Sequence, residues 1–277
     1  MTGEVRQIEI TRLITALQRR LARGEDLTLY GPRGSGKSTV LLRLQARFEC
    51  SGIPCAYCAS TAALGDITRA LERAYPGIDT LEAARRTARV RLWRAAERRA
   101  GVLLLDHFRC NGSAMVSFLR RLHGKIAGVL SAVDVDVDRE RSRMQPWRYG
   151  AMSVRMPLAT PRQLRRMLEE RWRERQLPSL ETAAARGFVA AAHGRPGWIA
   201  KCVELAGEQR YWCEHGAMVT VLCVDTEAAV RYPALAMVRT DLPGAPSEQG
   251  MGQLPSASAG GSAASGLMTP KRAGKLA

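Results

Sequence analysis

One stretch decides the fold of this chain: Leu27-Thr28-Leu29-Tyr30-Gly31-Pro32-Arg33-Gly34-Ser35-Gly36-Lys37-Ser38. Residues 27–30 form a compact apolar run that reads as a strand, and residues 38–48 resume a helical pattern after the glycine-rich loop. The loop, residues 31–38, fits the pattern G-x-x-x-x-G-K-[ST], which holds phosphates when it lies between a strand and a helix. Because that context is present, we predict a phosphate-binding loop.

Each residue type in the loop has a chemical role. Its glycines let the backbone curl so that successive N–H groups point at phosphate oxygens, and the next helix adds the positive end of its dipole. Lys37 is expected to pair with the β- and γ-phosphates of a nucleotide, and the Ser38 hydroxyl to ligate Mg²⁺. The predicted nucleotide-binding residues are Gly31, Pro32, Arg33, Gly34, Ser35, Gly36, Lys37, Ser38 and Thr39.

A second acidic motif follows downstream. Residues 102–105 are wholly apolar and end in Asp106, which is typical of a central parallel strand with both faces covered. Asp106 is expected to reach Mg²⁺ through water, and the alternative is an aspartate that caps a turn. His107 stands where many active ATPases carry Glu to orient the attacking water. Either His107 is a substitute base, or the protein hydrolyses slowly and acts mainly as a nucleotide switch.

The rest of the first 159 residues alternates between helical and strand patterns. Helices are expected over residues 10–21, 64–75, 81–99 and 113–123, and further strands over residues 53–60, 126–133 and 151–158. This alternation predicts an α/β fold of the P-loop NTPase kind, with a three-layer α/β/α parallel sheet and right-handed crossovers. Cys55 and Cys58 form a CxxC without a second pair at metal-ligand spacing, so we expect both to be buried structural residues.

From Thr160 onward the pattern becomes helical. Thr160 is expected to cap a helix that has Pro161 at its first position, and helical patterns return over 181–192 and 198–206. The predicted domains are a P-loop ATPase core over 1–159, a small helical lid and C-terminal appendix over 160–240, and a disordered tail over 241–277. The aromatic residues between 210 and 232 suit either the core of the lid or a DNA-binding or partner-binding appendix.

Charge and hydropathy bear on partners and location. The formal net charge is +16 and the pI about 10.3, which favours a polyanionic partner such as DNA. Most of the basic residues are Arg, a bias that a GC-rich genome also produces. No apolar run is long enough to span a membrane, and residues 1–12 lack the apolar stretch of a secretory signal, so a cytoplasmic protein without membrane partners is expected.

From about Val5 to Ala206 the chain resembles an AAA+ type P-loop ATPase. The resemblance rests on the Walker A stretch GPRGSGKS at 31–38, the Walker B stretch VLLLDH at 102–107, and a strand in the sensor-1 place that carries Ser131. The stretch HGRPGW at 193–198 is similar to the sensor-2 region of origin-recognition, archaeal-type and TniB-like transposition-helper ATPases. The chain departs from the pattern at His107 and in having no clear sensor-1 asparagine.

The resemblance implies a DNA-linked ATPase that binds ATP rather than GTP and forms a homo-oligomer. It implies that Arg195 senses the γ-phosphate, which makes Lys37, Asp106, His107 and Arg195 the predicted catalytic residues, with Ser38 and Asp106 as Mg²⁺ ligands. Candidates for an arginine finger that reaches a neighbouring subunit are Arg109, Arg139, Arg141, Arg143 and Arg148.

Two other function classes fit parts of the sequence. A STAND-type signalling or scaffold NTPase would use the same loop and lid to act on a protein partner with little hydrolysis. A small-molecule kinase would use the arginines, but no acceptor-binding signature accompanies them. Salt-dependent retention of DNA distinguishes the DNA-linked ATPase from the protein-directed switch, because contacts with DNA phosphates weaken steeply as salt rises.

Overall fold

The computed structural model describes residues 2–75, 85–108, 112–134, 152–213 and 216–233. Its first part contains α1 (Thr2–Ala22), β1 (Leu27–Gly31), α2 (Lys37–Cys50), β2 (Cys55–Cys58), α3 (Leu64–Ala74), α4 (Arg85–Arg98), β3 (Val102–Leu105), α5 (Ser113–Leu122), β4 (Gly128–Asp134) and β5 (Met152–Arg155). Its second part contains α6 (Pro161–Glu174), α7 (Thr182–Ala192), α8 (Pro196–Ala206), a 3₁₀ turn (Gln209–Tyr211), β6 (Trp212–Cys213), β7 (Gly216–Ala217) and α9 (Val219–Arg231). The five arginine-finger candidates and the tail over 241–277 lie outside the described residues.

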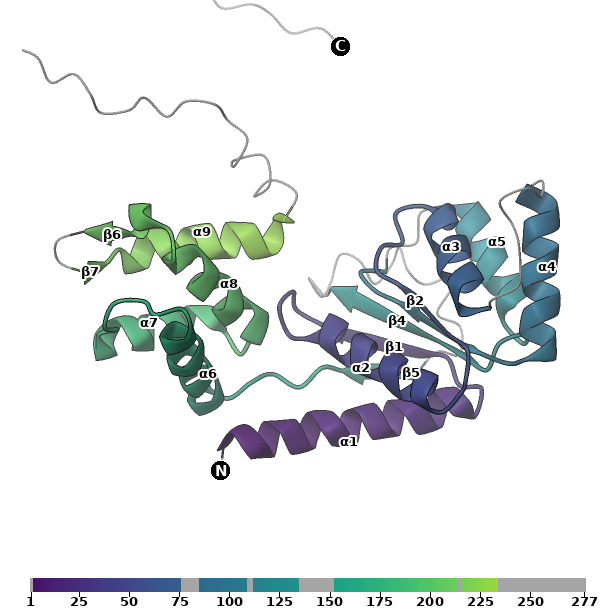
Figure 1. The fold of residues 1–277 in the computed structure, drawn as a ribbon, viewed down its shortest axis with the longest axis horizontal. Coiled ribbons are helices and arrows are strands. Elements are labelled where there is room, and N and C mark those ends of the chain that lie inside the picture. The colour runs from purple at the N-terminus through teal and green to yellow at the C-terminus, as the bar shows by residue number, and fades with distance from the viewer. Residues whose placement is uncertain (1, 76–84, 109–111, 135–151, 214–215, 234–277) are drawn as a thin grey trace, which may run out of the picture.

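The five longer strands form one parallel sheet in the order β2-β3-β4-β1-β5. Successive side chains point to opposite faces, so Leu103 and Leu105 pack under α3, α4 and α5, while Val102 and Leu104 pack with α1 and α2. Helices therefore cover both faces of the sheet (Figure 1). The predicted three-layer α/β/α architecture is confirmed.

Two local predictions about this sheet also hold. Cys55 and Cys58 are buried in β2, one on each side of the sheet, and each thiol is free. The strand expected over 126–133 is present as β4, but it begins at Gly128 and continues to Asp134. That last residue has consequences for the candidate site.

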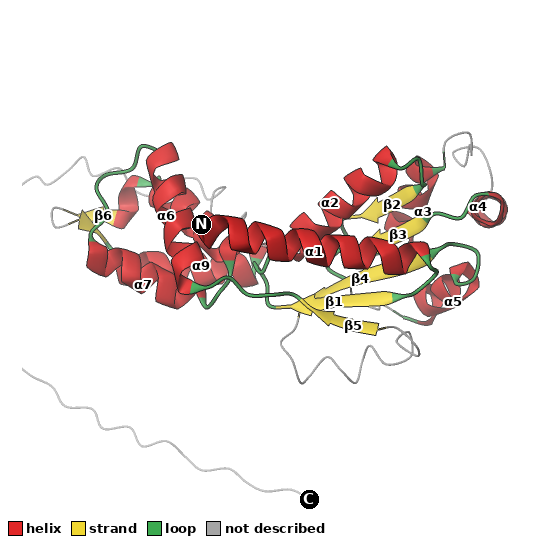
Figure 2. Cartoon of the chain, turned by 90° about the horizontal axis from the view of Figure 1, so that it is seen from below, coloured by secondary structure: helices red, strands yellow, loops and turns green. Residues whose placement is uncertain are grey.

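Helices α6 to α9 pack around a separate apolar cluster that contains Trp172, Phe188, Trp198 and Leu222. At the start of α6, the Gln163 backbone N–H donates to the Thr160 hydroxyl, so the predicted cap is present. The 3₁₀ turn brings buried Tyr211 into the same cluster, and Trp212 packs against it, which supports the lid-core interpretation for these two residues; Tyr232 is exposed. The extended segment after β5 joins this group to the sheet (Figure 2). The group lies within the predicted lid, residues 160–240, and is called the lid below.

No helix in the described part of the chain combines the length and apolarity needed to cross a membrane.

Candidate functional site

The predicted phosphate loop lies between β1 and α2. Gly34 and Gly36 have φ angles of +77° and +101°, a region that glycine enters without steric cost. Gly36 is the N-cap residue of α2, no side chain caps this helix, and its first turn carries no acidic residue. The N–H groups of that turn therefore remain available to an anion, and the helix dipole favours one. The buried Ser35 hydroxyl also has no hydrogen-bond partner among the described residues. These features fit a bound phosphate group.

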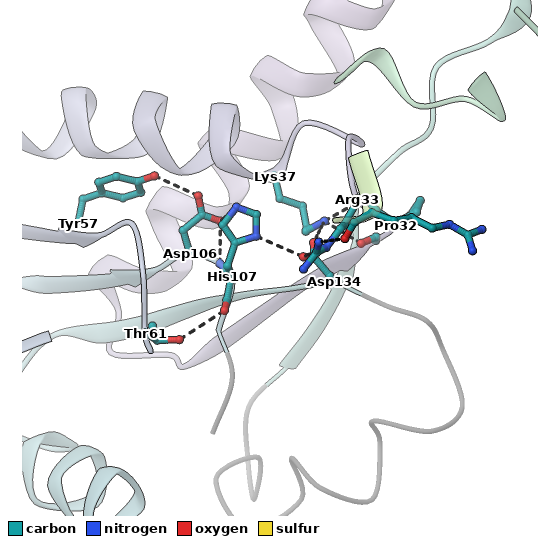
Figure 3. Close-up of polar contacts among 10 residues, drawn as sticks. Pro32, Arg33, Lys37, Tyr57, Thr61, Asp106, His107 and Asp134 are labelled. Atoms are coloured by element: carbon teal, nitrogen blue, oxygen red, sulfur yellow. Dashed lines mark hydrogen bonds and ion pairs between the residues drawn. The ribbon is translucent and has the colours of Figure 1, made fainter. Parts of the chain in front are cut away.

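Lys37 is buried at the first position of α2 (Figure 3). Its Nζ donates to the carbonyl oxygens of Gly31 at 2.7 Å and Pro32 at 3.0 Å. The same Nζ lies 2.8 Å from Oδ1 of Asp134. The lysine that was predicted to hold phosphates is thus paired with a carboxylate in this structure.

Asp134 is the centre of the charged contacts in this site (Figure 3). Its Oδ1 pairs with Lys37, as described above. Its Oδ2 accepts a hydrogen bond from Nε of Arg33 at 2.9 Å and lies 3.2 Å from Nδ1 of His107. Burial opposes ionisation of Asp134, but the hydrogen bonds and positive charges of His107 and Lys37 outweigh it and hold the pKa of this carboxyl well below its usual range.

Asp134 was not among the predicted site residues. The available signal was its place at the end of a buried strand, the same signal that identified Asp106. In the sheet β4 lies between β1 and β3, and Asp134 is opposite Gly31 in register. Ser131, expected in the sensor-1 strand, lies deeper in β4, and within the described part of the chain its buried hydroxyl has no hydrogen-bond partner. Asp134 is a residue of β4 whose side chain pairs with the loop, through Lys37 and Arg33.

Asp106 directly follows β3 and is 2% exposed. Its Oδ2 accepts from the hydroxyl of Tyr57 at 3.0 Å, and its Oδ1 accepts from the backbone N–H of His107 at 2.9 Å. Both partners hold the carboxylate in one orientation. Tyr57, on β2, was also missed, because nothing in the sequence pairs it with Asp106.

His107 has a positive φ of 46°, and its side chain is about half exposed. Its Nε2 lies 4.0 Å from Oδ1 of Asp106, while Nδ1 faces Asp134. The hydrogen bond to Asp134 raises the pKa of the His107 imidazole above its usual value, against the opposing effect of burial. The imidazole therefore bridges the two aspartates at the ends of β3 and β4 (Figure 3).

The residues present fit a magnesium ion that arrives with phosphate. Ser38 offers a hydroxyl at the start of α2, and Asp106 offers an oriented carboxylate. Within the described residues, no group of three or more His, Cys, Asp or Glu side chains could hold a metal by itself. Mg²⁺ typically keeps such a sparse protein ligand set and takes its other ligands from water and phosphates.

The lid contacts the loop directly. The Gly197 backbone N–H, in the first turn of α8, donates to the Gly34 carbonyl oxygen at 2.7 Å. A Cβ on Gly197 would lie 2.8 Å from Cα of Gly34, so the contact requires glycine. Arg33 makes a second link, because its guanidinium donates to the carbonyl oxygen of Arg231 at the end of α9.

Arg195 immediately precedes α8 and is 8% exposed. Its guanidinium pairs with Glu227 at 2.7 Å and donates to the carbonyl oxygens of Ala191 and Ala192. Among the described residues these partners all belong to the lid. Arg195 lies two residues before Gly197, which contacts the loop. Its guanidinium, however, forms an ion pair with Glu227.

Neither a protein-family model nor a curated protein matches this sequence. Solved structures match the fold. The ORC1 protein of Aeropyrum pernix, solved in complex with DNA, is 19% identical with a TM-score of 0.55 over 86% of this chain and 68% of that chain. The ORC2 protein of the same organism, solved as ADPNP–ADP complexes, is 20% identical with a TM-score of 0.52 over 73% of this chain and 62% of that chain.

Cdc6p of Pyrobaculum aerophilum is 17% identical, with a TM-score of 0.50 over 74% of this chain and 62% of that chain. The chain thus spans less than two thirds of the ORC2 protein and of Cdc6p. The predicted resemblance to origin-recognition proteins is confirmed at the level of the fold.

Proposed function

We propose that this chain binds ATP with Mg²⁺ and uses binding, followed by slow hydrolysis, to drive a conformational switch. The observation that carries the proposal is the uncapped N-terminus of α2 behind the glycine loop, with Lys37 at its first position. The ORC2 protein with a similar fold was solved as nucleotide complexes, which supports the assignment.

In this proposal the backbone N–H groups of the loop and Lys37 bind and orient the phosphates. Ser38 and Asp106 hold Mg²⁺, which when bound neutralises developing charge on the phosphate oxygens. Tyr57 fixes the Asp106 carboxylate through the hydrogen bond from its hydroxyl. His107 lies next to Asp106 and has the role of positioning the attacking water, and Arg195 that of a lid residue responsive to nucleotide.

The lid is the moving part of the proposed switch. Phosphate binding changes the charge around the loop, and the loop contacts the lid through Gly34 and Arg33. Differential affinity of the nucleotide for two lid positions is what converts binding into a conformational signal.

We also propose that the protein associates with DNA. The supporting surface is the outer side of α3, α4 and α5. These three helices pack against the same apolar cluster. Trp93 of α4 packs against Phe118 of α5 with ring centroids 6.4 Å apart, and the Arg121 guanidinium lies 5.8 Å from the Trp93 ring centroid. Exposed arginines on and beside these helices are Arg69, Arg73, Arg91, Arg94, Arg98, Arg99, Arg120 and Arg121.

Within the described side chains of these three helices, the exposed acid is Glu97, and it pairs with Lys125. Arg91, Arg94 and Arg98 follow helical spacing on the face of α4 opposite buried Leu92. A row of exposed arginines on one face fits a regularly spaced phosphate backbone. The ORC1 protein with a similar fold was solved with DNA, which agrees with this proposal.

A transposition-helper role of the TniB kind, and assembly into a homo-oligomer, are finer proposals that rest on the resemblance at 193–198. The alternative is a STAND-type NTPase that acts on a protein partner with little hydrolysis. The direct contact between loop and lid suits this alternative equally, whereas the arginine surface favours DNA.

The test is ATP binding and turnover by the purified chain with Mg²⁺, with and without double-stranded DNA, beside Lys37→Ala. We expect tight ATP binding and DNA-stimulated turnover, both lost in Lys37→Ala, and thermal unfolding without nucleotide reports whether that variant is folded. Unchanged ATP affinity in Lys37→Ala contradicts a functional phosphate loop. Tight binding with no turnover under either condition supports the STAND-type alternative.

A further inference from the structure

A negative charge stands inside the proposed phosphate site. Asp134 Oδ1 lies 2.8 Å from Nζ of Lys37, the side chain assigned to the β- and γ-phosphates. Its Oδ2 pairs with Arg33 of the same loop at 2.9 Å. The carboxylate thus forms ion pairs with Lys37 and Arg33, two cationic side chains that a phosphate-binding loop is expected to offer to its ligand.

Asp134 is held in its ionised form at neutral pH, because neighbouring cations lower its pKa despite burial. A phosphate group is also an anion and binds the same ammonium. Two anions in a partly buried site repel each other, and one cation cannot satisfy both fully. Binding of nucleotide phosphate must therefore disturb the Asp134–Lys37 pair.

We propose that Asp134 sets the balance between nucleoside triphosphate and diphosphate at this site by competing with the γ-phosphate for Lys37. The inference rests on the proposed function, since it assumes a nucleotide in the loop. A diphosphate lacks the terminal phosphate and its charge, so it requires less displacement of the carboxylate. A triphosphate must displace Asp134 to obtain the full interaction with Lys37, and its affinity is reduced accordingly.

The displacement has a route to the lid. Arg33 binds Asp134 through Nε, while another nitrogen of the same guanidinium donates to the Arg231 carbonyl oxygen at the end of α9. Arg33 thus spans from the strand end to the lid. When a triphosphate separates Asp134 from Lys37, Arg33 loses or changes one of its two partners, and the contact with α9 changes with it.

A supporting role for Asp134, in place of a competing one, predicts the opposite effect on nucleotide affinity. If Asp134 served only to hold Lys37 and Arg33 in a binding-ready position, removing its charge would loosen the loop and weaken both nucleotides. The two roles are therefore separated by the sign and the selectivity of the effect on affinity.

The experiment measures equilibrium affinity for a non-hydrolysable ATP analogue and for ADP, each with Mg²⁺, in the full chain. The variants are Asp134→Asn, which keeps the shape and removes the charge, and Asp134→Glu, which keeps the charge. Glu97→Gln is the matched control, because it removes one exposed acid on α4, away from the loop. Thermal unfolding without nucleotide reports whether each variant is folded.

We expect Asp134→Asn to bind the ATP analogue about tenfold tighter and ADP within about twofold of the wild type, given the usual strength of like-charge repulsion in such sites. Asp134→Glu and Glu97→Gln should keep the wild-type ratio of the two affinities. Equal changes for both nucleotides, or weaker ATP binding in a folded Asp134→Asn, overturn the inference. If the wild type binds neither nucleotide, the proposed function itself is wrong, and this inference falls with it.

Discussion

The backbone N–H of Gly197 donates to the carbonyl oxygen of Gly34 over 2.7 Å, so a glycine of the lid rests directly on a glycine of the phosphate loop. Neither position has room for a side chain: a Cβ on Gly34 would lie 3.1 Å from the backbone nitrogen of Trp198, and one on Gly197 would lie 2.8 Å from Cα of Gly34. The backbone of the loop thus packs directly against the backbone of the lid, and this contact is short because neither residue has a side chain. It gives the lid a fixed contact with the proposed nucleotide site.

Gly197→Ala should separate the lid from the loop. Alanine normally favours a helix, but here its methyl group meets backbone that cannot rotate away, so we expect a loss of about 1–3 kcal/mol in stability and weaker ATP binding. Thermal unfolding and nucleotide titration measure both effects. The matched control is Gly187→Ala in α7, whose Cβ would lie 3.4 Å from a side-chain atom of Val219. A Gly197→Ala variant that behaves like this control would contradict the contact.

Glu227 should make the stability of the lid depend on pH. The hydrogen bond from Arg195 lowers the pKa of Glu227 from 4.5 to about 2, so its contribution is fully present above pH 4.5 and is lost as the pH falls toward 2. Glu227→Gln should therefore lower stability by about 1–2 kcal/mol near neutral pH, and the difference from the wild type should shrink across that window.

Unfolding temperatures of the wild type and of Glu227→Gln, measured from neutral pH down to about pH 2, check this prediction. Glu174→Gln, which changes an exposed acid at the end of α6 in the same lid, is the control and should follow the wild type throughout. A constant difference between wild type and Glu227→Gln at all pH values would show that the ion pair with Arg195 is not its source.

A carboxylate at position 107 should support ATP turnover only when the side chain at position 134 is neutral. His107→Glu alone would place a third acid between Asp106 and Asp134, whose oxygens lie 4.0 and 3.2 Å from the imidazole nitrogens. We expect this variant to turn over ATP more slowly than the wild type, and the double variant with Asp134→Asn to exceed the single variant by about tenfold. Phosphate release at saturating ATP is the measurement, and additive effects of the two changes would rule out this coupling.

Charge reversal on α4 should weaken DNA binding specifically. Arg94→Glu with Arg98→Glu removes two proposed phosphate contacts, so we expect at least about tenfold weaker binding of duplex DNA and a salt dependence shallower by about two in log–log slope. Arg12→Glu with Arg19→Glu makes the same change in net charge at exposed positions of another helix, α1, and is the control. Equal loss of affinity in both variants would mean that overall charge, and not this surface, attracts DNA.

Much of the fold could be predicted from local pattern. The strand, the glycine loop and the helix between Leu29 and Val40 are predicted from patterns that are adjacent in the sequence. The apolar run that ends at Asp106 reads as a doubly covered strand without knowledge of its neighbours. Thr160 and Pro161 define the start of α6 through a cap that involves only the next few residues. In each case the interactions that determine the element are short-range.

The sequence by itself therefore determined the class of fold and predicted the phosphate loop and the acid at Asp106, because periodicity, capping and glycine conformations act locally along the chain. Only the tertiary structure decided which distant groups meet at the site. Strand order places β4 between β1 and β3, which brings Asp134 to Lys37, Arg33 and His107. Lid packing brings Gly197 to Gly34 and Arg195 to Glu227. Such pairings depend on how the chain crosses over and docks, and no local pattern carries that information.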